Sequence, residues 1–106
     1  MSALIYCPFP DRETARAIAT QLLDDKLIAC ANILGEVESL YEWGGERGTA
    51  QELGVLMKTH ADLLDRAVER LSHLHPYDVP AVLGWQCDAT GREAAAWLNS
   101  LNQGEA

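Results

Sequence analysis

The feature that most constrains the fold of this chain is the order in which short apolar runs alternate with segments of helical periodicity. Apolar or alternating runs are typical of strands, and they occupy residues 3–7, residues 27–34 continuing through 37–43, residues 53–59 and residues 81–87. Apolar residues recur at the i, i+3, i+4, i+7 spacing of a helix over residues 12–25, over residues 60–74 and again after Thr90. The predicted order is therefore β-α-β-β-α-β-α.

Local signals predict where the helices begin. Asp11 can cap the first helix, because its carboxylate accepts hydrogen bonds from the free amides of the first turn. Thr59 with Asp62 resembles a capping box for the second helix, and Thr90 with Glu93 resembles one for the third. The stripe expected to face inward on the third helix consists of Ala94, Trp97, Leu98 and Leu101.

Two βαβ crossovers that share a central hairpin define a split βαβ, or ferredoxin-like, α+β fold with an antiparallel sheet. The hairpin turn is predicted at Gly44, Gly45 and Gly48. Both crossover helices lie on one face of such a sheet, and a short C-terminal helix cannot cover the other. Because that face carries Val37, Tyr41 and Trp43, we expect another subunit to bury it. The whole chain, residues 1–106, is expected to form one domain.

Charge and hydropathy narrow the class of partner and the compartment. The net charge of −8 would repel phosphate backbones and anionic membranes, so we expect neither a nucleic acid nor a membrane partner. The apolar stretches are far shorter than the roughly 20 residues of a membrane helix. The first residues lack the basic start and long apolar run of a secretory signal, which favours the cytoplasm. Three cysteines at irregular spacings do not indicate a disulfide scaffold.

Cysteine and histidine side chains are the candidates for metal ligation. Cys7 ends the first predicted strand and Cys30 lies within the second, so each is either a small buried hydrophobe or a sulfur ligand for a soft metal. His75 ends the second predicted helix, where it can bond the last carbonyls or line a cleft. No local zinc or calcium motif occurs, so any metal must be held by residues that are distant in sequence.

Other polar and aromatic residues leave two interpretations open. Lys58 precedes a predicted helix start, where it either attracts an anion or is simply solvated. Tyr41 and Trp43 are either interface aromatics or surfaces on which a ligand stacks, and Glu52 is expected to face solvent. No nucleophile elbow, phosphate-binding loop or dinucleotide-binding glycine pattern occurs, so we do not expect an enzyme.

Four motifs together resemble one known family. They are L-I-A-C-A-N-I at residues 27–33, S-L-Y-E-W-G-G at 39–45, M-K-T at 57–59 and H-P-Y-D-V-P at 75–80. In this order and spacing they resemble the CutA family of divalent-cation tolerance proteins, and the resemblance covers nearly the whole chain. It implies a ferredoxin-like subunit, similar in shape to the PII signalling proteins, that assembles as a homotrimer.

The resemblance also implies a set of functional residues. Some family members bind copper, and similarity to them implies Cys7, Cys30 and His75 as metal ligands, with copper or another divalent cation as the bound ion. The family's cleft between subunits implies ligand-binding roles for Asn32, Tyr41, Trp43, Glu52, Lys58 and Tyr77.

Three hypotheses about function follow. The first is a cytoplasmic homotrimer that binds copper or a related transition metal and contributes to cation tolerance. The second is a PII-like sensor that binds a small anionic ligand in the cleft, with Lys58 supplying charge and Trp43 a stacking surface. The third is a structural scaffold or anchoring trimer.

Overall fold

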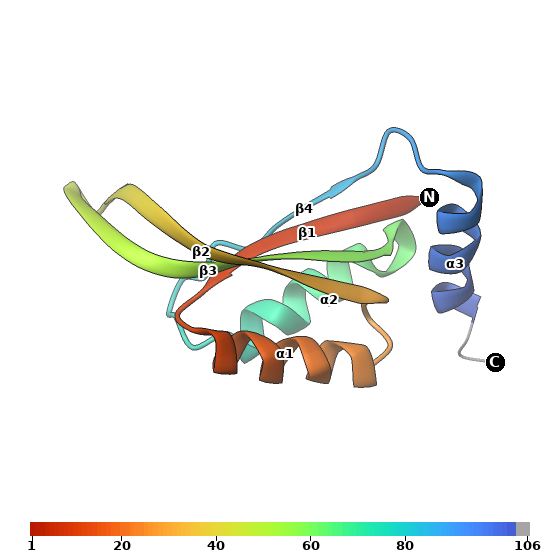
Figure 1. The fold of residues 1–106 in the computed structure, drawn as a ribbon, viewed down its shortest axis with the longest axis horizontal. Helices are drawn as coiled ribbons and strands as arrows, with labels where there is room; N and C mark the ends of the chain where they lie inside the picture. Colours follow the sequence, from red (N-terminus) through yellow and green to blue (C-terminus); the bar gives the residue numbers. More distant parts are fainter. Residues whose placement is uncertain (104–106) are drawn as a thin grey trace.

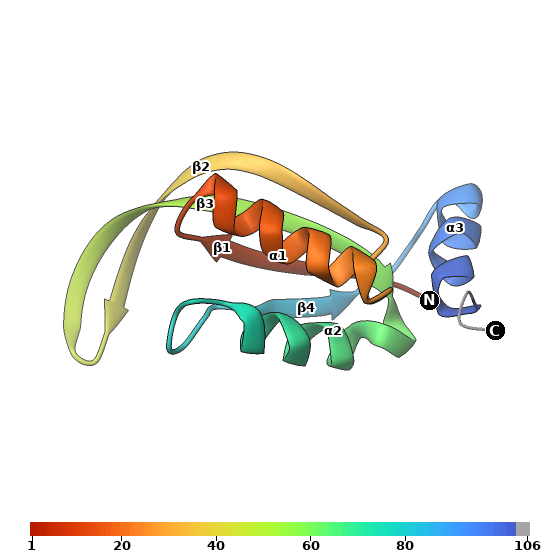
Figure 2. The same ribbon diagram turned by 90° about the horizontal axis from the view of Figure 1, so that it is seen from below.

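Four antiparallel strands and three helices make up the part of the chain that the computed structural model describes, residues 1–103. In chain order the elements are β1 (Ser2–Phe9), α1 (Arg12–Asp24), β2 (Cys30–Trp43), β3 (Glu46–His60), α2 (Ala61–Leu74), β4 (Leu83–Gln86) and α3 (Arg92–Gln103). The strand order is β2-β3-β1-β4, with β1 in antiparallel pairing to both β3 and β4. Helices α1 and α2 lie side by side on one face of the sheet, and α3 lies at the end where β1 begins (Figures 1 and 2). The predicted ferredoxin-like α+β fold is confirmed.

The hydrophobic core lies between the sheet and the two crossover helices. Because side chains alternate across a strand, every second residue of β1 and β3 faces the helices. The fully buried residues of these strands include Ile5, Cys7, Phe9, Val55 and Met57. They meet the apolar stripe of each helix, which contributes Ala15, Ile18, Leu22, Ala67 and Leu71. The strand and helix periodicities of the sequence thus converge on one core.

The end of α1 follows the Schellman pattern. The Leu27 amide donates to the Leu22 carbonyl at 3.0 Å and the Lys26 amide donates to the Leu23 carbonyl at 3.1 Å. Lys26 accordingly has φ 61°. The residue before it, Asp25, accepts hydrogen bonds from Gln21 Nε2 at 2.9 Å and from Arg70 Nε at 3.1 Å. A carboxylate at this otherwise unfavourable helix end therefore joins α1 to α2.

The start of α2 differs from the prediction. His60 is the N-cap, because its Nδ1 accepts a hydrogen bond from the Asp62 amide at 3.0 Å. Thr59 is fully buried, and its Oγ1 donates to the Leu27 carbonyl at 2.7 Å. The capping box predicted from Thr59 and Asp62 is therefore wrong, since the threonine hydroxyl fixes the connection between α1 and β2 instead. The predicted cap of α1 is confirmed, because Asp11 Oδ1 accepts from the Thr14 amide at 2.8 Å.

The β2–β3 hairpin is long, and a bulge divides it. Its two-residue turn consists of Gly44 and Gly45, both at positive φ (60° and 82°), which is the conformation that suits the twist of a tight hairpin. Gly48 lies within β3 rather than in the turn. Between Ile33 and Gly35 the register shifts by one residue, and Gly35 has φ 110°. The far half of the hairpin extends beyond the body of the molecule (Figure 1).

The bulge reverses which side chains of β2 face the helices. Before it, Ile33 pairs with the core residue Val55; after it, Val37 pairs with Glu52 on the opposite face. Odd-numbered residues therefore change from the core face to the open face of the sheet. This crossing places Tyr41 and Trp43 on the open face.

The C-terminal third also differs in detail from the prediction. Strand β4 covers only Leu83–Gln86, because the Val82 amide donates to the Pro80 carbonyl in a turn before it. Of the stripe predicted to face inward on α3, Leu98 is buried, whereas Ala94 and Trp97 are exposed. Within residues 1–103 no helix has the length and apolar character of a membrane span.

Candidate functional site

The open face of the sheet carries several exposed apolar side chains. The large exposed ones are Tyr41, Trp43, Leu83 and Trp85. Cross-strand pairing places Trp85 opposite Leu4 and Leu83 opposite Tyr6, on the face that α1 and α2 do not cover. In the single chain, therefore, this face has the exposed aromatic surface that the sequence predicts.

One end of the open face is hollowed into a groove of about 500 Å³. The groove lies between the β2–β3 hairpin and the segment that follows α2. Four of the predicted cleft residues line it, namely Tyr41, Trp43, Glu52 and Tyr77. We call this feature the hairpin groove, and it brings together residues from β1, β2, β3 and the segment that follows α2.

A hydrogen-bonded network holds one wall of the hairpin groove. The Tyr77 hydroxyl donates to Glu52 Oε2 at 2.8 Å, which joins the loop to β3. Behind it, His75 Nδ1 accepts from the Tyr77 amide at 3.2 Å, and Nε2 lies 2.9 Å from the Pro8 carbonyl. Since Nδ1 accepts and a carbonyl can only accept, the proton is assigned to Nε2 and the imidazole is neutral. His75 also stacks on Phe9, with ring centroids 4.8 Å apart.

The same network raises the pKa of Tyr77. Burial, the hydrogen bond to the Glu52 carboxylate and the negative charge of that carboxylate together raise the pKa of Tyr77 to about 12. The phenol therefore remains neutral and continues to donate to Glu52 well above physiological pH.

Cys7 and Cys30 lie on opposite faces of the sheet. Cys7 pairs with Val55 in the core, and Cys30 pairs with Lys58 on the open face. Cys7 is completely buried, and this burial, with a smaller contribution from the charge of Glu52, raises the pKa of its thiol to about 12. A metal ligand must be the thiolate, so the interior position of Cys7 strongly disfavours ligation.

Cys30, Asn32 and Lys58 form a second group at the other end of the open face. The Cys30 thiol donates to Asn32 Oδ1 at 3.6 Å, and Lys58 is its cross-strand neighbour. Trp43 pairs with Glu46 at the first residue of β3, whereas Lys58 lies near the last. Within one subunit, the charge and the stacking surface of the anion-sensor hypothesis therefore lie at opposite ends of the sheet.

The predicted metal ligands Cys7, Cys30 and His75 do not form a joint site in one subunit. Both ring nitrogens of His75 already have backbone partners, and the two sulfurs are separated by the sheet. Across residues 1–103, no group of three or more histidine, cysteine, aspartate or glutamate side chains is arranged to hold a metal ion.

Two charged groove residues were missed by the sequence reasoning. Asp78 lines the hairpin groove beside Tyr77, and its place within the H-P-Y-D-V-P motif was a usable signal. Glu42 also lines it, and its exposed carboxylate binds Arg47 Nε at 3.0 Å. Alternation along an ideal flat strand puts Glu42 on the other face from Tyr41 and Trp43, so periodicity alone could not find it.

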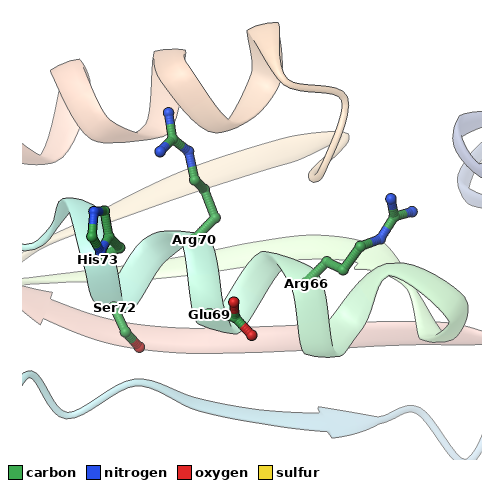
Figure 3. Close-up of a pocket in the computed structure, with 5 residues that line it drawn as sticks. All are labelled: Arg66, Glu69, Arg70, Ser72 and His73. Carbon is green, nitrogen blue, oxygen red and sulfur yellow. The ribbon is translucent and has the colours of Figure 1, made fainter.

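A second concavity, of about 560 Å³, lies on the helical side of the molecule and belongs to α2. Figure 3 shows its five labelled side chains, with Arg66 and Arg70 projecting to one side of the helix and Glu69 and Ser72 towards the other. Arg70 is already paired with Asp25. Arg66 and Glu69 point to different sides of α2, and Asp25 neutralises Arg70. These side chains therefore do not form a binding site for one ligand.

The strand order, with one layer of helices and an open face opposite, defines an α+β protein of the ferredoxin-like class. Within that class, the model of the CutA1 divalent ion tolerance protein family matches residues 3–101, and the chain belongs to this family. The family is described by cation tolerance rather than by a catalysed reaction.

Relatives support the assignment over almost the full chain. The divalent-cation tolerance protein CutA of Pyrococcus horikoshii is 40% identical over 95 residues, which are 90% of this chain and 92% of that protein. The crystal structure of CutA from Xylella fastidiosa has a TM-score of 0.88 at 34% identity, covering 94% of this chain and 96% of that one. The periplasmic divalent cation tolerance protein CutA of Archaeoglobus fulgidus has a TM-score of 0.88 at 28% identity, covering 95% and 98%.

Proposed function

We propose that this chain contributes to divalent-cation tolerance by binding copper, or a related transition metal, as a homotrimer. The observation that carries the proposal is the position of Cys30. It is a free, partly exposed thiol on the open face, next to the Asn32 amide oxygen. A thiolate is a preferred ligand for copper(I), and the names of the relatives supply the link to cations.

Assembly of subunits supplies the remaining ligands in this proposal. One subunit offers a single sulfur at this position, which is too few donors for tight binding. The open face that carries Cys30 also exposes Leu83 and Trp85, and burial of such a face is the usual reason for a symmetric oligomer. A second copy packed there would bring further donors to Cys30. The proposal does not depend on Cys7 or His75, because their sulfur and ring nitrogens lie within the folded subunit.

Native mass spectrometry of the reduced protein, with and without copper(I), tests assembly and binding together. We expect a trimer that takes up copper in multiples of three. Cys30→Ser should abolish this uptake, and Cys87→Ser is the matched control because Cys87 is also free and partly exposed. Copper uptake that survives in Cys30→Ser, or a monomer at all concentrations, would contradict the proposal.

The proposed compartment is the cytoplasm. Cys7, Cys30 and Cys87 are all free thiols, which suits a reducing compartment. The proposal assigns no catalysed reaction, and the net charge of −8 argues against a nucleic acid or anionic membrane partner. Cell fractionation with an antibody against the chain tests the location, and recovery from an oxidising compartment would contradict it.

A further inference from the structure

The β2–β3 hairpin leaves the body of the molecule at a point where two glycines face each other. Gly35 pairs with Gly54 at the bulge, and the part of the hairpin beyond it, residues 36–51, extends past the body (Figure 1). We call this part the hairpin arm. Strand β1 pairs with β3 only as far as Phe9 and Leu53, so in the sheet of the described residues the arm is a ribbon of two strands. Such a ribbon is only marginally stable by itself.

The facing glycines weaken the base of the hairpin arm. Neither has a side chain to contact its cross-strand neighbour, and such contacts are the unit of stabilisation in a sheet. Gly35 also has φ 110°, a backbone conformation that residues with a side chain rarely adopt. The arm would therefore bend easily at residues 35 and 54 unless a side chain from elsewhere in the molecule covers them.

Tyr6 of β1 covers Gly54. A Cβ atom at residue 54 would lie 2.9 Å from Tyr6 Oη and 3.4 Å from Tyr6 Cε1, so the phenol occupies the space that a side chain would take. The same Cβ atom would lie 3.2 Å from Cγ1 of Val37, which belongs to the arm. Tyr6 pairs with Leu56 and reaches Gly54 along the diagonal, which is within the range of an aromatic side chain. The geometry points to Tyr6 as the residue that holds the hairpin arm at a fixed angle to the body.

The phenol joins a rigid part of the sheet to a weak one. Strand β1 pairs with both β3 and β4, so Tyr6 belongs to the body, whereas Val37 belongs to the arm. An aromatic ring that lies across a glycine of a neighbouring strand restores the packing that the glycine lacks. These contacts lie within one subunit. The consequence for function rests on the proposed homotrimer, because an arm held at one angle meets the next subunit in one register.

Hydrogen exchange of the full-length protein, followed by mass spectrometry, tests the role of Tyr6. Tyr6→Ala removes the ring, so the amides of residues 36–51 should exchange at least about threefold faster, which is the effect expected for loss of a cross-strand aromatic contact. The amides of α1 should exchange at their original rate. Unchanged exchange in the arm, or an equal rise in the arm and in α1, would overturn the inference.

A second substitution tests whether Tyr6 acts through Gly54. Gly54→Val places a side chain where the phenol lies, so the phenol must move and exchange in the arm should again rise. In Tyr6→Ala/Gly54→Val the valine occupies the space that the phenol leaves. The double variant should therefore exchange more slowly in the arm than either single variant, which is the sign of direct coupling. Additive effects would overturn the inference, and Tyr6→Ala alone decides it if Gly54→Val does not fold.

Leu4→Ala is the matched control. Leu4 is also half-buried and lies on the same face of β1, but it pairs with Lys58 and Trp85, away from the arm. If Leu4→Ala and Tyr6→Ala raise exchange in the arm alike, burial of the open face between subunits orders the arm, and the role of Tyr6 is wrong. Native mass spectrometry of the same samples counts the subunits. A monomeric original protein would contradict the proposed homotrimer, whereas the exchange comparison would still decide the role of Tyr6.

Discussion

His75 offers a direct test of whether a predicted metal ligand is instead a structural residue. The change His75→Phe keeps a ring that can stack on Phe9 but removes both ring nitrogens. The Pro8 carbonyl then loses the donor at 2.9 Å, and the Tyr77 amide loses the acceptor at 3.2 Å. His75 is only 6% exposed, but Pro8 is half-buried and Tyr77 is 37% exposed, so water can partly replace the lost partners.

The expected cost follows from those two hydrogen bonds. Each contributes about 0.5–1.5 kcal/mol net, so the variant should lose about 1–3 kcal/mol of stability in the absence of metal. For a chain of this size, each kcal/mol lowers the melting temperature by roughly 4–8 °C. His73→Phe is the control, because His73 is exposed on the last turn of the same helix and should change stability by no more than about 0.5 kcal/mol.

Urea unfolding of the metal-free protein at one fixed subunit concentration measures the difference, since the stability of an oligomer depends on concentration. The reasoning is refuted if His75→Phe unfolds at the same urea concentration as the original protein. If the stability of the metal-free variant is unchanged while its copper affinity falls, His75 is a metal ligand and not a structural residue.

Three further predictions follow from the pKa values and burial. In the native protein Cys30 should react with a thiol reagent, whereas Cys7 should react only on unfolding; equal native rates would contradict its burial. Because the pKa of Tyr77 is raised from 10.0 to about 12, the stabilisation from its neutral form is complete below pH 10 and is lost as the pH rises towards 12. The difference in tyrosinate absorbance between the original protein and Tyr77→Phe should therefore develop near pH 12, and development near pH 10 is the contrary result. Hydrogen bonds from the first turn of α1 lower the pKa of Asp11 below 3.8, so its stabilisation is present above that pH and lost as the pH falls below it. Asp11→Asn should retain the cap but lose less stability as the pH falls through this range. An acid unfolding curve identical to that of the original protein would show that the Asp11 carboxylate does not contribute to the pH dependence.

Much of the fold was predictable because it depends on local patterns. Gly44 and Gly45 form the hairpin turn, where both residues have positive φ angles that glycine adopts readily. The buried faces of α1 and α2 follow from the helical spacing of their apolar residues. The errors arose where two neighbouring residues compete for one role. Thr59 and His60 can both cap a helix, and only the folded chain, which brings the Leu27 carbonyl to the Thr59 hydroxyl, decides that the threonine is used elsewhere. On α3, Trp97 fits the apolar period but has no layer to pack against in the single chain.

The site was less predictable because its contacts join distant parts of the sequence. Tyr77 and Glu52 meet only when the loop after α2 folds against β3. Cys7 and Cys30 both lie in apolar runs, and the strand register alone shows that they face opposite sides. The bulge at residues 33–35 decides the side on which the aromatic residues of the hairpin lie. In the sequence, Gly35 is the only local indication of that bulge.

The position of β1 in the sheet has a consequence for the order of events in folding. This strand is synthesised first, yet Ser2 pairs with His60 and Ala3 pairs with Gln86, so both of its partners emerge much later. The β2–β3 hairpin can close as soon as its own residues are made, because its pairing is local. We therefore expect the hairpin to form early and β1 to insert late, so that its apolar residues remain exposed during synthesis and need protection from aggregation on the ribosome.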